Sequence, residues 1–284
     1  MESFSLRDGR VLTYHEAGEG RPTLCHPGGP CFSSDYLEYI GTAFPGRRLI
    51  FLDPRGTGAS DPPEDSDSYR LADYAADVEA LRRHLELDVC DFIGHSHGSL
   101  VGLVYAADHL DRVDKMLLMA TAARFQAEQV AAMDAAIERR SGKPWFADAS
   151  AALAAEEAGA FADDGELGRL IARELPFYFA RYGESERAFV ERVLDTPVHG
   201  AALRCWNARE FETFDLRPAL GRIRAWTLIV VGGEDFILGP RAAAEVADGV
   251  PGAEVVELPG VGHFPWIEDP QAFEAAVSSF RPSR

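Results

Sequence analysis

The stretch VCDFIGHSHG, residues 89–98, joins a short apolar run to a Gly-x-Ser-x-Gly motif. The run is dense rather than alternating, which is typical of a β-strand buried on both faces of a sheet. Apolar side chains then recur at the spacing of one helix face, at Leu100, Leu103, Val104 and Ala107. The segment therefore predicts a buried strand, a sharp turn at Ser96 and a helix that starts directly after the turn.

Similar apolar runs and helical patterns alternate along the rest of the chain. Further strands are predicted at 23–25, 49–52, 116–119, 227–231 and 254–258, after a hairpin whose strands, 4–6 and 11–14, flank Asp8-Gly9. Helices are predicted at 71–85, 242–247 and 270–280. This alternation indicates an α/β fold, with a mostly parallel sheet of eight strands and helices on both of its faces.

The alternation stops between the strands at 116–119 and 227–231. Residues 124–217 are rich in Ala, Glu and Arg, show helical patterns, and contain turn signals at 142–144 and 163–165. We therefore expect residues 1–123 and 218–284 to form an α/β core domain, and residues 124–217 to form an inserted helical cap.

The composition disfavours several classes of partner. The 284 residues carry 28 basic and 46 acidic side chains, a net charge of −18, which argues against nucleic acid and anionic membranes. No run approaches the ~20 apolar residues that cross a bilayer, and the first residues resemble no secretion signal. The four cysteines form no Cys-x-x-Cys pair and are interpreted as apolar fillers, as expected in a cytoplasmic protein.

Ser96 is the predicted nucleophile. The turn exposes its hydroxyl, and the helix N-terminus places partial positive charge beside it. Serine needs a base, and His263, just after the strand at 254–258, is expected to supply one. Asp235, in the loop after the strand at 227–231, is expected to orient that imidazole, with its neighbour Glu234 as the rival acid.

The loop HPGGP, residues 26–30, follows the strand at 23–25 and is expected to lie beside the nucleophile. Pro27 has no N–H, so the backbone N–H groups of Gly29 and His97 are the predicted donors to an oxyanion. Although several His residues and Cys31 lie near this predicted site, their spacing matches no closed zinc pattern. We therefore expect neither a metal nor a cofactor.

These motifs occur in the order found in one known group. The loop Gly28-Gly29-Pro30, the segment DPRGTGAS at 53–60, the turn at Ser96, Asp235 and Gly262-His263 together resemble the proline iminopeptidase group of α/β-hydrolases. The resemblance covers residues 22–122 and 226–280 and implies an α/β-hydrolase fold. Cys31, Pro54 and His97 stand where that group usually has Gly, Gln and Trp.

The resemblance also implies an activity. Members of the group remove an N-terminal aminoacyl residue, often proline, and hold the free amine with carboxylates of the cap. The stretch RELPFYF at 173–179 is similar to a cap stretch that carries one such carboxylate. The resemblance therefore implies Glu174 as an amine-binding residue, with Glu210 as a second candidate, and a small-molecule or short peptide substrate with a free amine.

Three functions remain open at this point. The first is the hydrolysis of an aminoacyl amide through an acyl-enzyme. The second is a carboxylesterase or lactonase with the same three catalytic residues and an apolar cap pocket, formed by Pro176, Phe177, Phe179, Trp206 and Phe211. The third is a binding protein without turnover, which the complete set of catalytic residue types disfavours. The sequence does not distinguish a monomer from a homo-oligomer.

Overall fold

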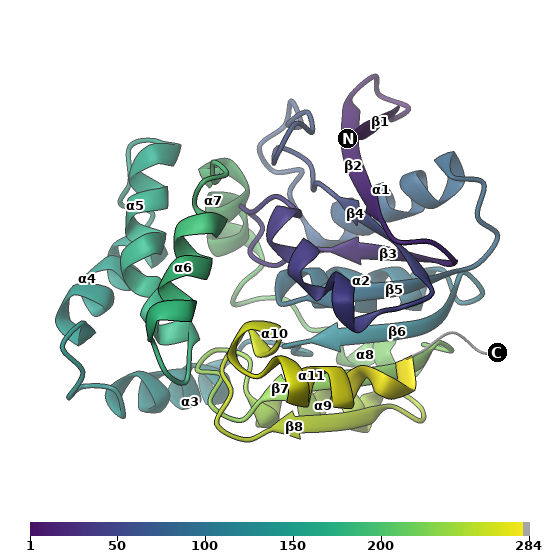
Figure 1. Ribbon diagram of the computed structural model, residues 1–284. Helices are drawn as coiled ribbons and strands as arrows, with labels where there is room; N and C mark the ends of the chain where they lie inside the picture. Colours follow the sequence, from purple (N-terminus) through teal and green to yellow (C-terminus); the bar gives the residue numbers. More distant parts are fainter. Residues whose placement is uncertain (281–284) are drawn as a thin grey trace.

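An eight-stranded sheet forms the centre of the protein (Figure 1). The structure is a computed structural model and describes residues 1–280. The strand order is β1-β2-β4-β3-β5-β6-β7-β8, with antiparallel pairing of β1 with β2 and of β2 with β4, and parallel pairing elsewhere. The strands are β1 (Glu2–Ser5), β2 (Val11–Ala17), β3 (Arg21–His26), β4 (Arg47–Leu52), β5 (Cys90–His95), β6 (Val113–Met119), β7 (Trp226–Gly232) and β8 (Glu254–Leu258). The predicted α/β fold is confirmed.

The central strands are buried on both faces, which explains their dense apolar sequences. Every residue of β5 is buried, and so are the last six residues of β7. Ile93 of β5 lies opposite Leu117 of β6, and Leu118 of β6 lies opposite Ile229 of β7. This rigid centre ends, at the carboxyl edge of β5, with the turn that carries Ser96.

Helices cover both faces of the sheet. The helices that pack on it are η1 (Asp35–Ala43), α1 (Leu71–His84), α2 (His97–Asp108), α9 (Pro240–Gly249), α11 (Pro270–Ala276) and η3 (Val277–Phe280). In Figure 1, α11 lies in front of the sheet and α8 (Arg217–Leu220) lies behind it. The helix predicted over 270–280 ends earlier than expected, because the chain tightens into the 3₁₀ helix η3 after Ala276.

The chain between β6 and β7 is helical and stands apart from the sheet (Figure 1). Its elements before α8 are α3 (Ala127–Glu138), α4 (Phe146–Glu157), α5 (Asp164–Glu174), η2 (Leu175–Tyr178), α6 (Glu184–Val193) and α7 (Gly200–Arg209). The two ends of this insertion lie side by side, since the Leu216 N–H donates to the Ala123 carbonyl at 2.8 Å. The division into core and cap at 124 and 217 stays a prediction.

The two predicted turns in the insertion have different outcomes. Residues 142–144 do connect α3 to α4. The turn predicted at 163–165 is wrong, because Asp163 is the N-cap of α5: its side chain accepts a hydrogen bond from Glu166 N at 2.8 Å. A capping aspartate and a glycine inside the first helical turn resemble a turn signal in sequence.

Two further expectations concern the cysteines and the absence of membrane-spanning segments. All four cysteines are buried and none forms a disulfide, in agreement with their predicted role as fillers. Across residues 1–280, none of the helices combines the length and the apolar character that crossing a membrane requires.

Candidate active site

Ser96 occupies a strained turn between β5 and α2. Its backbone angles are φ 52° and ψ −121°, a conformation that is rare for a residue with a side chain. A Cβ on Gly98 would collide with the carbonyls of His26 and Pro27, and a Cβ on Gly94 would collide with the Gly98 carbonyl. The two glycines of the motif therefore let three backbone segments cross at this turn, and the Ser96 side chain stays accessible.

The structure places Asp235 and His263 in direct contact. Asp235 Oδ2 lies 2.7 Å from His263 Nδ1, and Asp235 Oδ1 accepts the backbone N–H groups of Ile237 at 3.0 Å and Leu238 at 3.1 Å. Burial raises the pKa of Asp235, but His263 and the backbone donors outweigh it, so the net pKa is lowered. Asp235 is thus held as a carboxylate whose second oxygen faces the imidazole.

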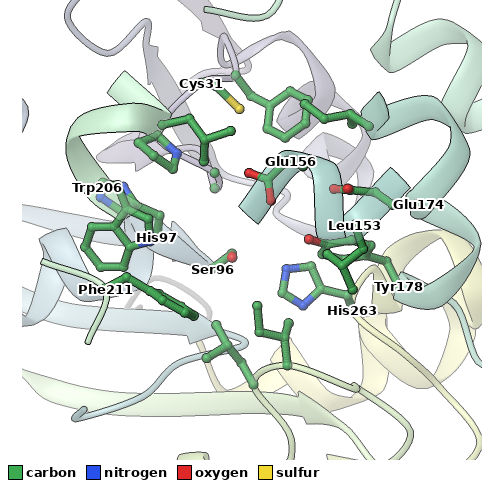
Figure 2. Close-up of a pocket in the computed structure, with 18 of the residues that line it drawn as sticks. Cys31, Ser96, His97, Leu153, Glu156, Glu174, Tyr178, Trp206, Phe211 and His263 are labelled. Carbon is green, nitrogen blue, oxygen red and sulfur yellow. The ribbon is translucent and has the colours of Figure 1, made fainter. Parts of the chain in front are cut away.

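Figure 2 shows the ring of His263 beside the Ser96 hydroxyl in one pocket. Ser96, His263 and Asp235 are therefore brought together in the order nucleophile, imidazole and carboxylate, as the sequence predicts. Glu234, the rival acid, is exposed, and its backbone carbonyl accepts a hydrogen bond from Arg140 Nη2 at 2.8 Å. The geometry favours Asp235 over Glu234.

A hydrogen-bonded chain that the sequence analysis missed connects the loops around Ser96. The Gly28 N–H donates to Tyr36 Oη at 2.5 Å, Tyr36 Oη lies 2.7 Å from His95 Nδ1, and His95 Nε2 lies 3.0 Å from the His263 carbonyl. Since a carbonyl only accepts, His95 carries its proton on Nε2 and accepts from Tyr36 at Nδ1. Burial and the nearby His263 lower the pKa of His95 well below its usual value, so this neutral form persists.

The predicted oxyanion donors lie beside the nucleophile. A Cβ on Gly28 would come within 2.7 Å of the Ser96 Cβ, so the loop packs directly against Ser96. The Gly28 N–H is used by Tyr36 and Pro27 has none, which leaves the N–H of Gly29, at φ +43°, as the next donor in the loop. His97 is the first residue of α2, where backbone N–H groups have no partner within the helix. This arrangement supports both predicted donors.

The pocket above Ser96 has a volume of about 400 Å³ and lies between the sheet edge and the helical insertion. Five acidic side chains line it, from Asp134 of α3, Glu156 and Glu157 of α4, Glu174 of α5, and Glu212 after α7. Figure 2 shows Glu156 and Glu174 in this pocket, with Tyr178 and His263 on the side of Glu174. The structure therefore places the predicted residue Glu174 in the pocket and adds four acidic residues that the sequence analysis missed, Asp134, Glu156, Glu157 and Glu212.

Within residues 1–280, no cationic side chain pairs with Glu156, Glu157 or Glu174. Glu174 is 4% exposed, and its Oε2 has no hydrogen-bond partner among the described residues. Burial and the charges of Glu156 and Glu157 raise the pKa of Glu174 well above its usual value. Burial and the charge of Glu157 raise the pKa of Glu156 to about 7. Both side chains also sit at helix C-termini, whose partial negative charge favours a cation nearby.

A sequence signal for Glu156 does exist. Ala149, Ala152, Leu153 and Glu156 share one helix face, as do Leu167, Leu170, Ile171 and Glu174. In each helix, a glutamate stands at the position on this face where the spacing would place a fourth apolar residue. The pattern predicts a buried charge at both sites.

Glu210 lies outside this pocket. Its Oε2 accepts the Leu71 N–H at 2.8 Å and so satisfies the N-terminus of α1, a structural role that the sequence analysis did not predict. Of the apolar pocket residues suggested for an esterase, Trp206 and Phe211 line the pocket, whereas Pro176, Phe177 and Phe179 belong to the buried core. Within residues 1–280, no three His, Cys, Asp or Glu side chains are grouped as a metal site would require.

Glu268 fastens the loop of His263 to the insertion. Its two carboxylate oxygens accept the Gly262 N–H and the Ala180 N–H, each at 2.8 Å, while the His263 N–H donates to the Tyr178 carbonyl at 2.7 Å. Burial raises the pKa of Glu268 from 4.5 to about 7. Because the folded pKa exceeds the unfolded one, this residue stabilises the fold most below pH 4.5, and that contribution is lost as the pH rises through about 7.

The Glu268→Gln variant is expected to unfold about 1–3 kcal/mol more easily, since one backbone N–H would face an amide N–H₂. Gln does not titrate, so the stability advantage of the wild type should shrink between pH 5 and pH 8. Urea unfolding of both proteins at several pH values measures this difference. The exposed Glu274 of α11 supplies a control, Glu274→Gln. A difference that stays constant with pH would contradict the assignment.

Residues 22–270 match the family described as alpha/beta hydrolase fold, and the chain belongs to that family. It is similar to the proline iminopeptidase of Levilactobacillus brevis, at 25% identity over 91% of this chain and 87% of that protein. The Bacillus subtilis AB hydrolase superfamily protein YisY is 28% identical, over 96% of both chains. The enol-lactonase structure from Burkholderia xenovorans LB400 has 25% identity and a TM-score of 0.76, covering 98% of this chain and 99% of that one.

These similarities agree with the resemblance seen in the sequence. The chain is an α/β-hydrolase and is similar to the proline iminopeptidase group at low identity.

Proposed function

We propose that this hydrolase cleaves the amide bond after an N-terminal aminoacyl residue, on a peptide or on a non-peptide amine. Glu174 and Glu156 carry the proposal, because both are buried, both line the pocket of Ser96, and neither has a cationic partner in the part of the chain that the structure describes. The ammonium group of an aminoacyl substrate would provide the missing charge. Similarity to the L. brevis proline iminopeptidase supports the same substrate class.

In the proposed reaction, His263 Nε2 takes the proton of the Ser96 hydroxyl as Oγ attacks the substrate carbonyl. Asp235 keeps the Nδ1 proton of His263 in place and stabilises the imidazolium. The N–H groups of Gly29 and His97 bind the oxyanion. His263 then returns the proton to the leaving amine, and water, activated by the same imidazole, releases the amino acid from Ser96.

The carboxylates would act by orienting the substrate. An ammonium bound between Glu156 and Glu174 fixes the acyl group over Ser96. The carbonyl is then already oriented for attack by Ser96 Oγ, which lowers the entropic cost of the reaction. The cost of burying like charges side by side is already carried by the folded protein, so the cation gains more from binding than it would at an exposed carboxylate. A substrate with a blocked amine would forgo this gain.

A carboxylesterase or lactonase is the second candidate. The pocket walls are largely apolar, with Leu153, Leu203, Trp206 and Phe211 among the lining residues. The similarity to the B. xenovorans enol-lactonase favours this reading. It gives no role to the buried carboxylates Glu156 and Glu174, however, which is why the aminoacyl function is preferred.

A matched substrate panel tests the proposal. Proline and alanine p-nitroanilides, each with a free and with an N-acetylated amine, are compared with p-nitrophenyl acetate, and Ser96 is labelled with a fluorophosphonate. We expect the free-amine anilides to be cleaved at least about 100-fold faster than the acetylated ones. Equal rates on both, or turnover of the ester alone, would reject the aminoacyl reading in favour of the esterase. Absence of all turnover and of labelling at Ser96 would reject both.

A further inference from the structure

Asn207, the only asparagine in the sequence, lies on the face of α7 that lines the pocket. Leu203, Trp206 and Asn207 all line it, and their spacing of three and four residues places them on one side of the helix. Leu203 and Trp206 are each 8% exposed, whereas Asn207 is half-buried. A polar amide therefore stands at a position of this wall where the spacing would place an apolar residue.

The partner of this amide is Glu156, which belongs to a different helix, α4. The Asn207 side chain hydrogen-bonds to the Glu156 carboxylate. An ionised carboxylate only accepts hydrogen bonds, so the amide donates through its N–H₂ group, and this fixes which of its two ends faces Glu156. Because both residues line the pocket, the bond joins α4 to α7 across one part of its wall.

This hydrogen bond favours the ionised form of Glu156. Burial and the charge of Glu157 raise the pKa of Glu156, the bond from Asn207 lowers it, and the outcome is a pKa of about 7. None of the other ionisable groups that interact with its charge is a cation; they are Glu174 of α5, Tyr178 of η2 and Cys31 in the loop after β3. Within residues 1–280, Asn207 is therefore the group that stabilises the charge of Glu156.

The direction of this hydrogen bond matters for the pocket. Figure 2 shows Glu156 between Trp206 of α7 on one side and Glu174 on the other. Asn207 directly follows Trp206, so its amide reaches Glu156 from the side of α7. A carboxylate that is held on that side by one oxygen has its second oxygen free to face Glu174. A cation between the two carboxylates would then meet an oxygen that is already oriented, which favours binding.

We propose that Asn207 is a positioning residue, whose amide holds one oxygen of Glu156 and so keeps the other directed at a cation bound between Glu156 and Glu174. Asn207 acts through Glu156 and needs no contact with the ligand. Without this donor, the carboxylate would rotate more freely and would take up a proton more readily. That the cation is the amine of an aminoacyl substrate rests on the proposed function.

The hydrogen bond is tested directly by NMR, without any substrate. Because the chain has a single asparagine, protein labelled with ¹⁵N in the asparagine side chain shows one N–H₂ group. We expect its proton resonances to move with pH, with a midpoint near 7, as Glu156 ionises. The movement should disappear in Glu156→Gln. It should persist in Glu268→Gln, the matched control, because Glu268 also has a pKa of about 7. Resonances that do not respond to pH, or that respond equally in Glu156→Gln, would overturn the proposal.

Kinetics test the effect on binding. Leu is similar in size to Asn but has no donor, so in Asn207→Leu the ratio of kcat/KM for alanine p-nitroanilide to that for p-nitrophenyl acetate should fall about tenfold. The pH at which this ratio rises should move up by about one pH unit, because burial and Glu157 are then unopposed. Asn207→Gln keeps an N–H₂ group and should restore part of the ratio.

An unchanged ratio and an unchanged pH profile in Asn207→Leu would overturn the positioning role. If the wild type does not favour a free amine over an acetylated one, the proposed function fails. The NMR titration still decides in that case whether Asn207 holds Glu156, so the two failures are distinguishable.

Discussion

Replacing Asp235 by Asn should lower kcat by about 10⁴-fold, while replacing the adjacent Glu234 by Gln should leave it unchanged. Asn offers His263 Nδ1 either an oxygen or an N–H₂ group, and the backbone donors of Ile237 and Leu238 already claim one oxygen of residue 235. The amide oxygen is then expected to face those donors, and the N–H₂ group would face the imidazole. His263 would carry its proton on Nε2 and could not accept one from Ser96.

The measurement is kcat on p-nitrophenyl acetate, a substrate that needs no carboxylate in the cap. Labelling of Ser96 by a fluorophosphonate should slow in parallel, because it also needs a base. Unfolding curves in urea show whether the two variants are folded. Equal losses in the two variants, or a larger loss in Glu234→Gln, would mean that Asp235 is not the carboxylate that supports His263 in catalysis.

The central part of this site could be predicted from sequence because its causes are local. A strand that ends at His95, a helix that starts at His97 and glycines two residues before and after Ser96 are all visible within ten residues. Asp235 and His263 each follow a buried strand, and parallel strands end at the same edge of a sheet. The alternation of apolar runs and helical patterns was therefore enough to predict that these three residues lie close together.

The residues that the sequence analysis missed have distant partners. Tyr36 belongs to the helix η1, yet its hydroxyl joins the Gly28 N–H to His95. Glu268 likewise joins two loops that are 82 residues apart in sequence, at Ala180 and Gly262. No periodicity or local motif encodes such a bridge, because it exists only once the loops have packed.

Glu156 and Glu210 show which properties of a residue can be predicted from helical periodicity. Both carboxylates follow apolar residues of their own helix face, Leu153 in one case and Leu203 and Trp206 in the other. Burial is therefore predictable at Glu156, and partial burial is predictable at Glu210, which directly follows the last residue of α7. The role of each carboxylate is not predictable in this way. Glu210 accepts a hydrogen bond from the N-terminus of α1, whereas Glu156 lines the pocket. The sequence analysis named Glu210 as the second amine-binding candidate, whereas the structure places Glu156, which it did not name, in the pocket.

Replacing Glu174 by Gln should lower kcat/KM for a free-amine anilide on the order of 100-fold, because an ammonium in the pocket loses a buried ionic partner. The corresponding ester without an amine, p-nitrophenyl acetate, should be hydrolysed as in the wild type. Glu156→Gln should act in the same direction. Glu184 of α6 is exposed and offers a matched control, Glu184→Gln. A loss of equal size on both substrates would assign Glu174 to the stability of the pocket instead.

The pH dependence separates these two roles further. A carboxylate binds an ammonium only when ionised, and burial and the charge of Glu157 raise the pKa of Glu156 to about 7. The ratio of kcat/KM for the free-amine anilide to that for the ester should therefore rise with pH through about 7, and fall again as the substrate amine loses its proton near an ordinary value of about 7.7–8.0. Both substrates react through the same Ser96 and His263, so any pH effect on the shared catalytic step cancels in the ratio. In Glu156→Gln the rising limb should weaken or move, because one of the coupled carboxylates is gone. A ratio that does not change with pH in the wild type would show that the amine is not bound by these carboxylates.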